Sequence, residues 1–183
     1  MEPDLTFLDR EMEGIMKTVI RYAPVALEKP DDYEARANLM WASSWAINGF
    51  INGGKTQMWS CHPMEHELSA FFDVAHGAGL AVLTPRWMEY VLDEETVSRF
   101  YTYGVTVFGL DPARTPMEVA KQSIERTKQF LFETLGLPST LSALGVDEGA
   151  FETMAEKACG GGVLAGFKPL GKEDILTIYK MSR

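Results

Sequence analysis

Three histidines, the only ones in this chain of 183 residues, lie within a single stretch of fifteen. His62 and His66 are four residues apart, and His76 follows ten residues after the second of them. Two side chains at the first spacing lie on one face of a helix, where their imidazole nitrogens can converge on one ion. Imidazole suits iron, zinc, nickel and copper better than magnesium or calcium, so the spacing predicts a transition-metal site.

Three carboxylates in the same stretch, Glu65, Glu67 and Asp73, could bind an ion or orient its ligands. The alternative interpretation is that the first two histidines are surface residues on a polar helix face and that His76 begins the next element. The order of residues is His-Pro-Met-Glu-His and not His-Glu-x-x-His, which excludes a zinc-protease helix. The neighbouring Cys61 is expected to be a buried thiol that does not ligate.

Composition and charge narrow the class of protein. With 46% hydrophobic and 23% charged residues, the chain is typical of a soluble globular protein with one ordinary domain. Its net charge of −9 argues against nucleic acid and anionic membranes, because no basic patch is available to neutralise phosphates. Apolar runs are too short for a membrane span, no signal peptide is recognisable, and two distant cysteines indicate no disulfide framework. We therefore expect a cytoplasmic protein with a small-molecule partner.

Apolar residues recur at helical spacing along most of the chain, and alternating strand patterns are almost absent. Capping-box patterns open two long helices, at Asp31–Glu34 and at Thr115–Glu118. The second helix carries an apolar stripe, with Ile124 and Leu131, that ends before Gly136. The helix after the first cap is predicted near 32–50, and the other helices near 8–22, 58–72, 78–91, 94–108, 148–158 and 172–182. The predicted fold is an all-α single helical domain over 1–183.

Two further features each have two interpretations. Four aromatic residues could line an apolar substrate pocket, but aromatic residues at helical spacing are more often core, which is the interpretation we prefer. They are Trp41, Trp45, Phe50 and Trp59. Pro63 cannot donate a backbone hydrogen bond, so we expect the helix that carries the histidines to begin or kink there.

Several blocks of sequence on both sides of the histidines resemble one known enzyme family. They are Glu34–Ala42, Ala46–Gly49, His62 with His66 and the Glu-Leu after it, His76–Gly77, Leu83–Pro85, Arg99–Gly109, Leu135–Pro138 and Lys168–Asp174. The order and spacing of these blocks are similar to the C-terminal half of the iron-containing (group III) alcohol dehydrogenases, in their butanol dehydrogenase-like branch. The resemblance covers nearly the whole chain.

The resemblance assigns a role to each histidine. In that family a nucleotide-binding α/β domain precedes a helical domain, and one aspartate and three histidines hold iron or zinc between the two. By resemblance, His62 and His76 occupy the positions of the last two metal ligands. His66 matches a histidine near the nicotinamide that binds no metal and could act catalytically as a relay for the alcohol proton. Helical spacing alone pairs His62 with His66 instead, and between these two pairings we follow the family.

The resemblance also implies which parts of the family's site are missing. The family's first two ligands are an aspartate and a histidine four residues later, whereas Asp4 and Asp9 are followed at that spacing by Leu8 and Glu13. The glycine-rich nucleotide motifs of the N-terminal half are absent as well. We therefore expect Fe(2+) or Zn(2+) to bind weakly at most. NAD(P) is expected to bind only with a separate nucleotide-binding domain.

Three functions follow from these patterns. The one we favour is the C-terminal domain of an NAD(P)-dependent, metal-dependent alcohol dehydrogenase, an oxidoreductase for alcohol and aldehyde interconversion that is inactive alone. The second is a non-enzymatic helical interaction module or remnant, and the third is an independent metal-binding protein. The expected partners are a separate N-terminal nucleotide-binding half and a second copy of the chain, joined through apolar surface around Trp59, Met64 and Phe71.

Overall fold

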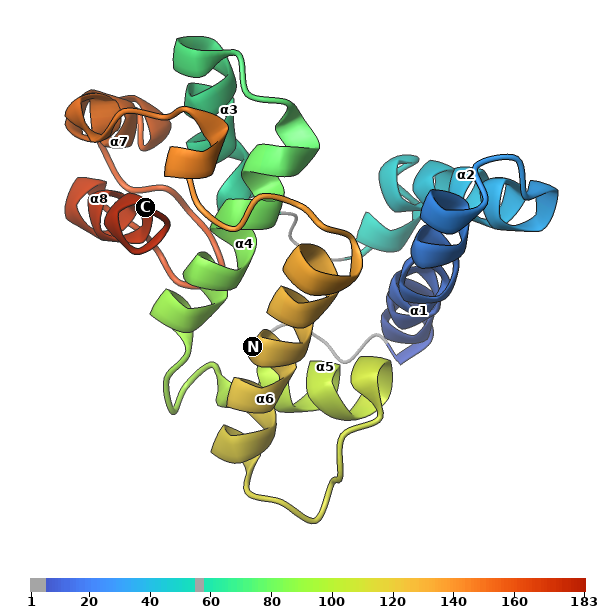
Figure 1. Cartoon of the computed structure of the whole chain (residues 1–183). Coiled ribbons are helices and arrows are strands. Elements are labelled where there is room, and N and C mark those ends of the chain that lie inside the picture. The colour runs from blue at the N-terminus through green and yellow to red at the C-terminus, as the bar shows by residue number, and fades with distance from the viewer. Residues whose placement is uncertain (1–5, 55–57) are drawn as a thin grey trace. The chain divides into compact units, whose positions relative to one another are not determined.

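The computed structural model describes residues 6–54 and 58–183, so that Asp4 lies outside the described residues. Within these ranges the regular elements are helices, and the β-structure is one isolated bridge between Leu164 and Leu170 (Figure 1). The all-α prediction is confirmed. Among the described residues, none of the helices combines the length and the apolar character that a membrane span requires.

The chain forms two compact units. The first consists of Met1–Gln57 and Ser98–Arg126, and the second of Met58–Val97 and Thr127–Arg183. The expected domain over 1–183 therefore contains two units, and the histidines all belong to the second of them.

The first unit contains a pair of packed helices at its start. Helix α1 (Thr6–Glu28) packs along α2 (Tyr33–Ile47), and both contact the short 3-10 helix η1 (Phe50–Asn52) (Figure 1). Helix α1 runs beyond the predicted end at residue 22 and contains Pro24. Helix α2 ends before the predicted residue 50, because the chain turns at Gly49 with a left-handed φ of 87°.

Helices α5 (Val97–Phe108) and α6 (Pro116–Lys128) complete the first unit with most of their length. They approach closely at Gly104, where a Cβ atom would lie 2.9 Å from a methyl group of Val119. Ile124 of the predicted apolar stripe is 3% exposed. This close approach explains why a glycine stands in the middle of α5.

Four helices form the second unit. Helix α3 (Cys61–Phe72) contacts α4 (His76–Val91) and α7 (Phe151–Ala158), and α8 (Lys172–Met181) contacts α4 and α7. Their facing sides bury a core that includes Met64, Leu68, Val82, Leu83, Val91, Met154, Ile175, Ile178 and Tyr179. The hydroxyl of Tyr179 donates a hydrogen bond to the backbone oxygen of Met64 at 2.7 Å. This bond joins the last helix to the helix that carries two of the histidines.

Irregular helical turns connect these elements. A π-helix, η2 (Gln129–Thr134), continues α6 into the second unit, and it ends before Gly136, whose φ is 67°. Two 3-10 helices follow, η3 (Ser142–Leu144) and η4 (Glu148–Ala150). Gly136 therefore stands just beyond the last helical turn, as its place in the sequence predicts.

The structure confirms one predicted capping box and corrects the other. At α6, the Thr115 hydroxyl accepts from the Glu118 N–H at 3.4 Å, and the Glu118 carboxylate accepts from the Thr115 N–H at 3.0 Å. At α2, the cap is Asp32 and not Asp31, since Asp32 accepts from the N–H of Ala35 at 2.8 Å. Alanine cannot return the bond, so a single capping bond holds the start of α2.

The preferred core interpretation of the aromatic residues is wrong for three of the four. Trp41, Trp59 and Phe50 are 68%, 46% and 44% exposed. The physical reason for Trp41 is that α2 carries apolar side chains around most of its circumference, whereas α1 covers one side of it.

The surface predicted for self-association needs a correction too. Met64 is fully buried and cannot contribute to it, while Phe71 is 39% exposed.

Candidate metal centre

Two consecutive helices bring the three histidines together. Helix α3 begins at Cys61, which places Pro63 in its first turn, where a backbone N–H has no helical partner to lose. The helix ends at Asp73, whose left-handed φ of 54° reverses the chain. Helix α4 then begins at His76 and packs against α3. The ring centroids of His62 and His76 are 5.2 Å apart, and those of His66 and His76 are 5.5 Å apart.

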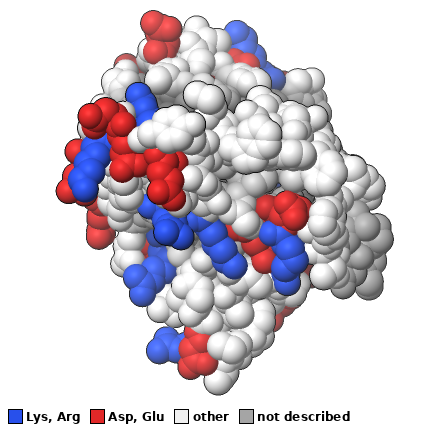
Figure 2. All heavy atoms as spheres, turned by 90° about the vertical axis from the view of Figure 1, so that its right-hand side faces the viewer, with Lys and Arg blue, Asp and Glu red and all other residues white. Residues whose placement is uncertain are grey.

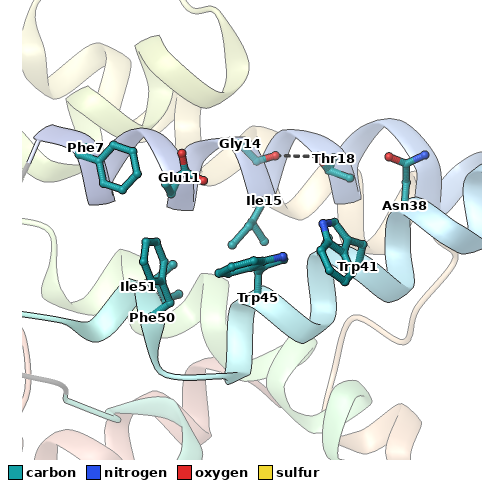
Figure 3. Close-up of a pocket in the computed structure, with 11 residues that line it drawn as sticks. Phe7, Glu11, Gly14, Ile15, Thr18, Asn38, Trp41, Trp45, Phe50 and Ile51 are labelled. Atoms are coloured by element: carbon teal, nitrogen blue, oxygen red, sulfur yellow. Dashed lines mark hydrogen bonds between the residues drawn. The ribbon is translucent and has the colours of Figure 1, made fainter.

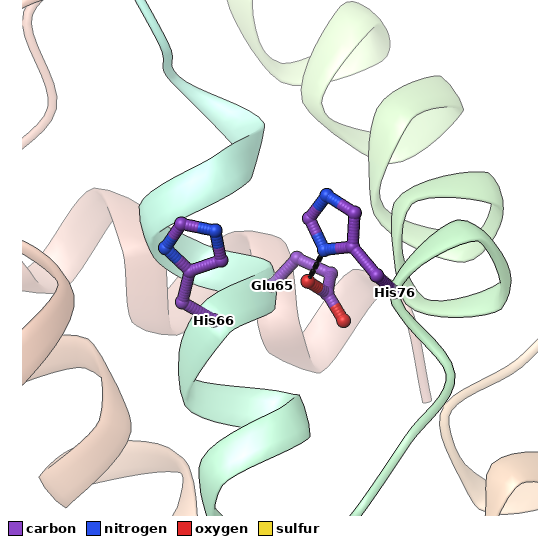
Figure 4. Close-up of side chains that lie close together, drawn as sticks. All are labelled: Glu65, His66 and His76. Carbon is purple, nitrogen blue, oxygen red and sulfur yellow. Dashed lines mark hydrogen bonds and ion pairs between the residues drawn. The ribbon is translucent and has the colours of Figure 1, made fainter.

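These distances fit a shared ion. Two imidazoles that bind one ion with bonds of about 2.1 Å place their ring centres roughly 5 Å apart. The His62 and His66 rings are farther apart, at 6.2 Å. One ligand atom each from Glu65, His66 and His76 lies within 4.8 Å of the other two, and Figure 4 shows these side chains facing one another across α3 and α4. The pairing of His62 with His76 as ligands stays a prediction.

The surroundings of His62 favour its neutral form. Its ring makes an edge contact with the ring of Trp59, with centroids 4.3 Å apart. Burial lowers the pKa of His62 from its ordinary value, and nearby His76 and His66 lower it further, against an opposite effect of Glu65. A neutral imidazole keeps the lone pair that a metal needs.

The three candidate carboxylates have different environments. Asp73 is exposed and ends α3, and Glu67 is half-buried, whereas Glu65 is completely buried and contacts His76. From the sequence alone, these three carboxylates are equally good candidates to bind an ion or to orient its ligands. A signal was nevertheless present, because positions 62, 65, 66 and 69 follow the i, i+3, i+4, i+7 pattern of one helix face.

Cys61 adjoins the histidines but is a poor ligand. Burial raises the pKa of its thiol to about 12, against a smaller effect of a hydrogen bond with Thr84. The thiolate is the form that binds metals, so a thiol that remains protonated near neutral pH is not expected to act as a ligand.

The first unit has a cavity of its own, with a volume of about 510 Å³. Its walls come from α1, α2 and η1, and Figure 3 shows Ile15 facing the ring of Trp45. Trp41 and Trp45 meet edge to face with centroids 5.9 Å apart, and Phe50 makes a similar contact with Trp45 at 5.3 Å. Three of the four aromatic residues singled out in the sequence thus line an apolar pocket, in a different unit from the histidines.

Charged side chains on the face drawn in Figure 2 are mixed in sign. Most lysines and arginines there lie beside aspartates or glutamates, and large areas carry neither kind. Within the second unit such pairs include Lys168 with Asp93 at 2.6 Å and Lys128 with Glu89.

Comparison with known proteins identifies the family. Residues 5–183 match the C-terminal part of the Fe-containing alcohol dehydrogenase family. The chain is 49% identical over 172 residues to NADH-dependent butanol dehydrogenase A of Clostridium acetobutylicum. The aligned residues make up 93% of this chain and 44% of that protein. It is also 34% identical over 177 residues to probable NADH-dependent butanol dehydrogenase 1 of Bacillus subtilis, and this alignment covers 96% of this chain and 45% of that protein.

Solved structures agree with this result. The NADH-dependent butanol dehydrogenase A of Thermotoga maritima superimposes with a TM-score of 0.86 at 33% identity, over 96% of this chain and 46% of that one. Aldehyde reductase YqhD of Escherichia coli gives a TM-score of 0.86 at 31% identity, over all of this chain and 48% of that one. The chain belongs to the Fe-containing alcohol dehydrogenase family and corresponds to its C-terminal, helical part. It spans less than half the length of these relatives.

Proposed function

We propose that this chain is the metal-binding part of an NAD(P)-dependent alcohol dehydrogenase that interconverts alcohols and aldehydes together with a nucleotide-binding half. The observation that carries the proposal is the convergence of three imidazoles at the junction of α3 and α4. It occurs in a chain that is 49% identical to a protein named as a butanol dehydrogenase.

In this proposal His62 and His76 hold the ion, which is Fe(2+) or Zn(2+). The ring separation of 5.2 Å supports this pair, and so does the lowered pKa of His62, which favours the neutral ring with a free nitrogen lone pair. A bound divalent ion supplies a Lewis acid that polarises an alcohol or aldehyde oxygen. His66 is exposed beside the pair and relays the alcohol proton towards solvent.

We expect the 183-residue chain alone to bind metal weakly and to have no dehydrogenase activity. Two imidazoles leave the rest of the coordination to water, which lowers the affinity of the site. Hydride transfer also needs a nicotinamide held by the second half. Calorimetric titration of the chain with NADH or NADPH should give no binding, and micromolar affinity would contradict this division of roles.

Metal titration tests the ligand assignment. Zn(2+) or Co(2+) should bind the wild-type chain with 1:1 stoichiometry, and His62→Ala and His76→Ala should weaken binding at least about tenfold. His66→Ala should weaken it less, and Lys121→Ala, at an exposed position of α6, is the control variant. A wild-type chain that binds no metal would contradict the proposal. A greater loss in His66→Ala than in His62→Ala would reject the assigned pair.

Mixing with a complementary half tests the activity. The partner is the part of butanol dehydrogenase A from Clostridium acetobutylicum that this chain does not match. The mixture should oxidise NADH with butanal, whereas each half alone and the mixture with His76→Ala should not. Activity that survives His76→Ala would show that the histidine centre is not required.

A further inference from the structure

Glu65 is a buried carboxylate next to the histidine cluster. Its side chain has no exposed surface, and each of its two oxygens meets a polar group. The Ser69 hydroxyl donates to Oε1 at 2.8 Å, and Nδ1 of His76 contacts Oε2. Burial of a carboxylate is costly unless it is hydrogen-bonded, so these two partners account for its presence in the interior.

The packing of α3 against α4 holds Glu65 in place. A Cβ atom at Gly79, in the first turn of α4, would lie 2.7 Å from both Cγ and Oε1 of Glu65. A glycine at this position is therefore what allows the carboxylate to pass beneath the start of α4. The side chain is enclosed by its own helix and by this turn, and its Oε2 is directed at His76.

We propose that Glu65 is a positioning residue for His76, an inference that rests on the proposed metal site. An ionised carboxylate can accept but not donate, so the shared proton lies on Nδ1 of His76. The other ring nitrogen, Nε2, then carries the lone pair, and Figure 4 shows it on the side of the ring away from Glu65. Glu65 thus sets both the tautomer and the orientation in which His76 presents Nε2 to an ion.

A different role for Glu65 would be that of a third ligand beside His66 and His76, since these three groups are near one another. The contact between Oε2 and Nδ1 argues against it. Nδ1 of His76 is occupied in that contact, so the histidine has only Nε2 left for an ion, on the side of the ring away from Glu65. Substitutions at Glu65 separate the two roles.

Ser69 makes glutamine an informative replacement. Its single hydroxyl proton faces two acceptors, Oε1 of Glu65 and the backbone oxygen of Val74, each at 2.8 Å. In Glu65→Gln the amide can donate to Ser69, which then donates to Val74. The amide oxygen can still accept from Nδ1 of His76. Glutamine therefore preserves the hydrogen bonds without the charge, whereas Glu65→Leu fills a similar volume without an acceptor.

The first experiment is nitrogen NMR of the metal-free chain, with labelled histidine, at pH 9 where free imidazole is neutral. His76 should be the Nδ1–H tautomer in the wild type and in Glu65→Gln. In Glu65→Leu it should change to the Nε2–H tautomer that free histidine prefers, while the signals of His66 stay unchanged. A wild-type His76 in the Nε2–H form would overturn the proposal, even where Glu65→Leu does not fold.

The second experiment is a Co(2+) titration of the same proteins. Glu65→Gln should stay within about threefold of the wild-type affinity, and Glu65→Leu should lose about 10- to 100-fold. Equal losses in both variants would identify Glu65 as a ligand and overturn the positioning role. A wild-type chain without metal affinity would count against the proposed function. The tautomer of His76 would still show whether Nδ1 donates a hydrogen bond to Glu65. Thermal melting of each variant identifies losses that come from unfolding.

Discussion

Among single residues, the neighbours of an ionisable group determine its pKa. Asp93 illustrates this outside the histidine cluster. Lys168 lies 2.6 Å from its carboxylate, and the N–H groups of Thr96 and Glu95 donate to the same side chain. The hydrogen bond from Lys168, with smaller effects of Thr96 and Glu95, lowers the pKa of Asp93 to about 2.

This low pKa predicts a pH-dependent contribution to stability. A carboxylate whose pKa is lowered by folding stabilises the protein above its unfolded pKa of about 3.9, and that contribution disappears as the pH falls through the folded value. Asp93→Asn should therefore be less stable than the wild type at pH 7, and the difference should shrink as the pH falls from 4 towards 2. Urea unfolding at several pH values measures it.

Asp111→Asn is the matched control for this experiment. Asp111 is exposed, and its carboxylate accepts from the N–H of Ala113 at 2.9 Å. Asparagine keeps an oxygen for that bond, just as it keeps one for the Thr96 N–H at position 93. The control should change stability little at any of these pH values. A constant difference between Asp93→Asn and the wild type would contradict the assigned role of the ion pair.

At the scale of elements, helix ends decide where side chains enter the site. The proline at position 63 is compatible with α3 because it falls in the first turn, and the reversal at Asp73 sends the chain back so that His76 meets α3. Helix α6 begins with a capping box, the reciprocal hydrogen bonds between Thr115 and Glu118. These bonds satisfy backbone donors that the first helical turn leaves free.

The cap of α6 can be tested by one substitution. Thr115→Ala should lower the free energy of unfolding by about 1 kcal/mol, because it removes the side-chain acceptor of the Glu118 N–H. Thr102→Ala makes the same chemical change in the middle of α5, where the hydroxyl is exposed and bonds to the Ser98 oxygen. It should change stability by less than about 0.5 kcal/mol. Equal effects in denaturant unfolding would mean that the cap is unimportant.

At the scale of the whole molecule, large apolar side chains remain on the surface. Met40, Trp41 and Ile47 of α2 are 72%, 68% and 82% exposed, and in the second unit Trp59 and Phe71 are exposed too. Several large apolar groups on one helix are typical of a surface that contacts another protein. A partner half or a second copy of the chain would cover them.

We predict that the purified chain forms dimers or larger species. Replacing Met40 and Ile47 together by glutamine should raise the dissociation constant on the order of tenfold, because both side chains lose apolar surface on association. At concentrations low enough for both proteins to be monomeric, the double variant should keep the wild-type melting temperature, since both positions are exposed in the single chain. Lys121→Gln is the control. Sedimentation that reports a monomer for the wild type at high concentration would contradict the prediction.

The local features of this protein can be predicted from its amino-acid sequence alone. Helical periodicity and caps predicted the all-α class, the cap of α6 at Thr115 and the end of its helical run before Gly136. The clustering of His62, His66 and His76 predicted that they would lie together. These features depend on residues within one or two helical turns, or on a short connection, so their pattern can be read along the chain.

Which face of each helix is covered depends on tertiary packing and could not be predicted from the sequence. The same periodicity that suggested a core position for Trp41 leaves it exposed, because exposure depends on which helix packs against α2. Three carboxylates lay near the histidines, and the packing of α4 at Gly79 selected Glu65 for burial against His76. The physical reason is that a side chain's environment is made by groups distant in sequence, as in the bond from Tyr179 to Met64.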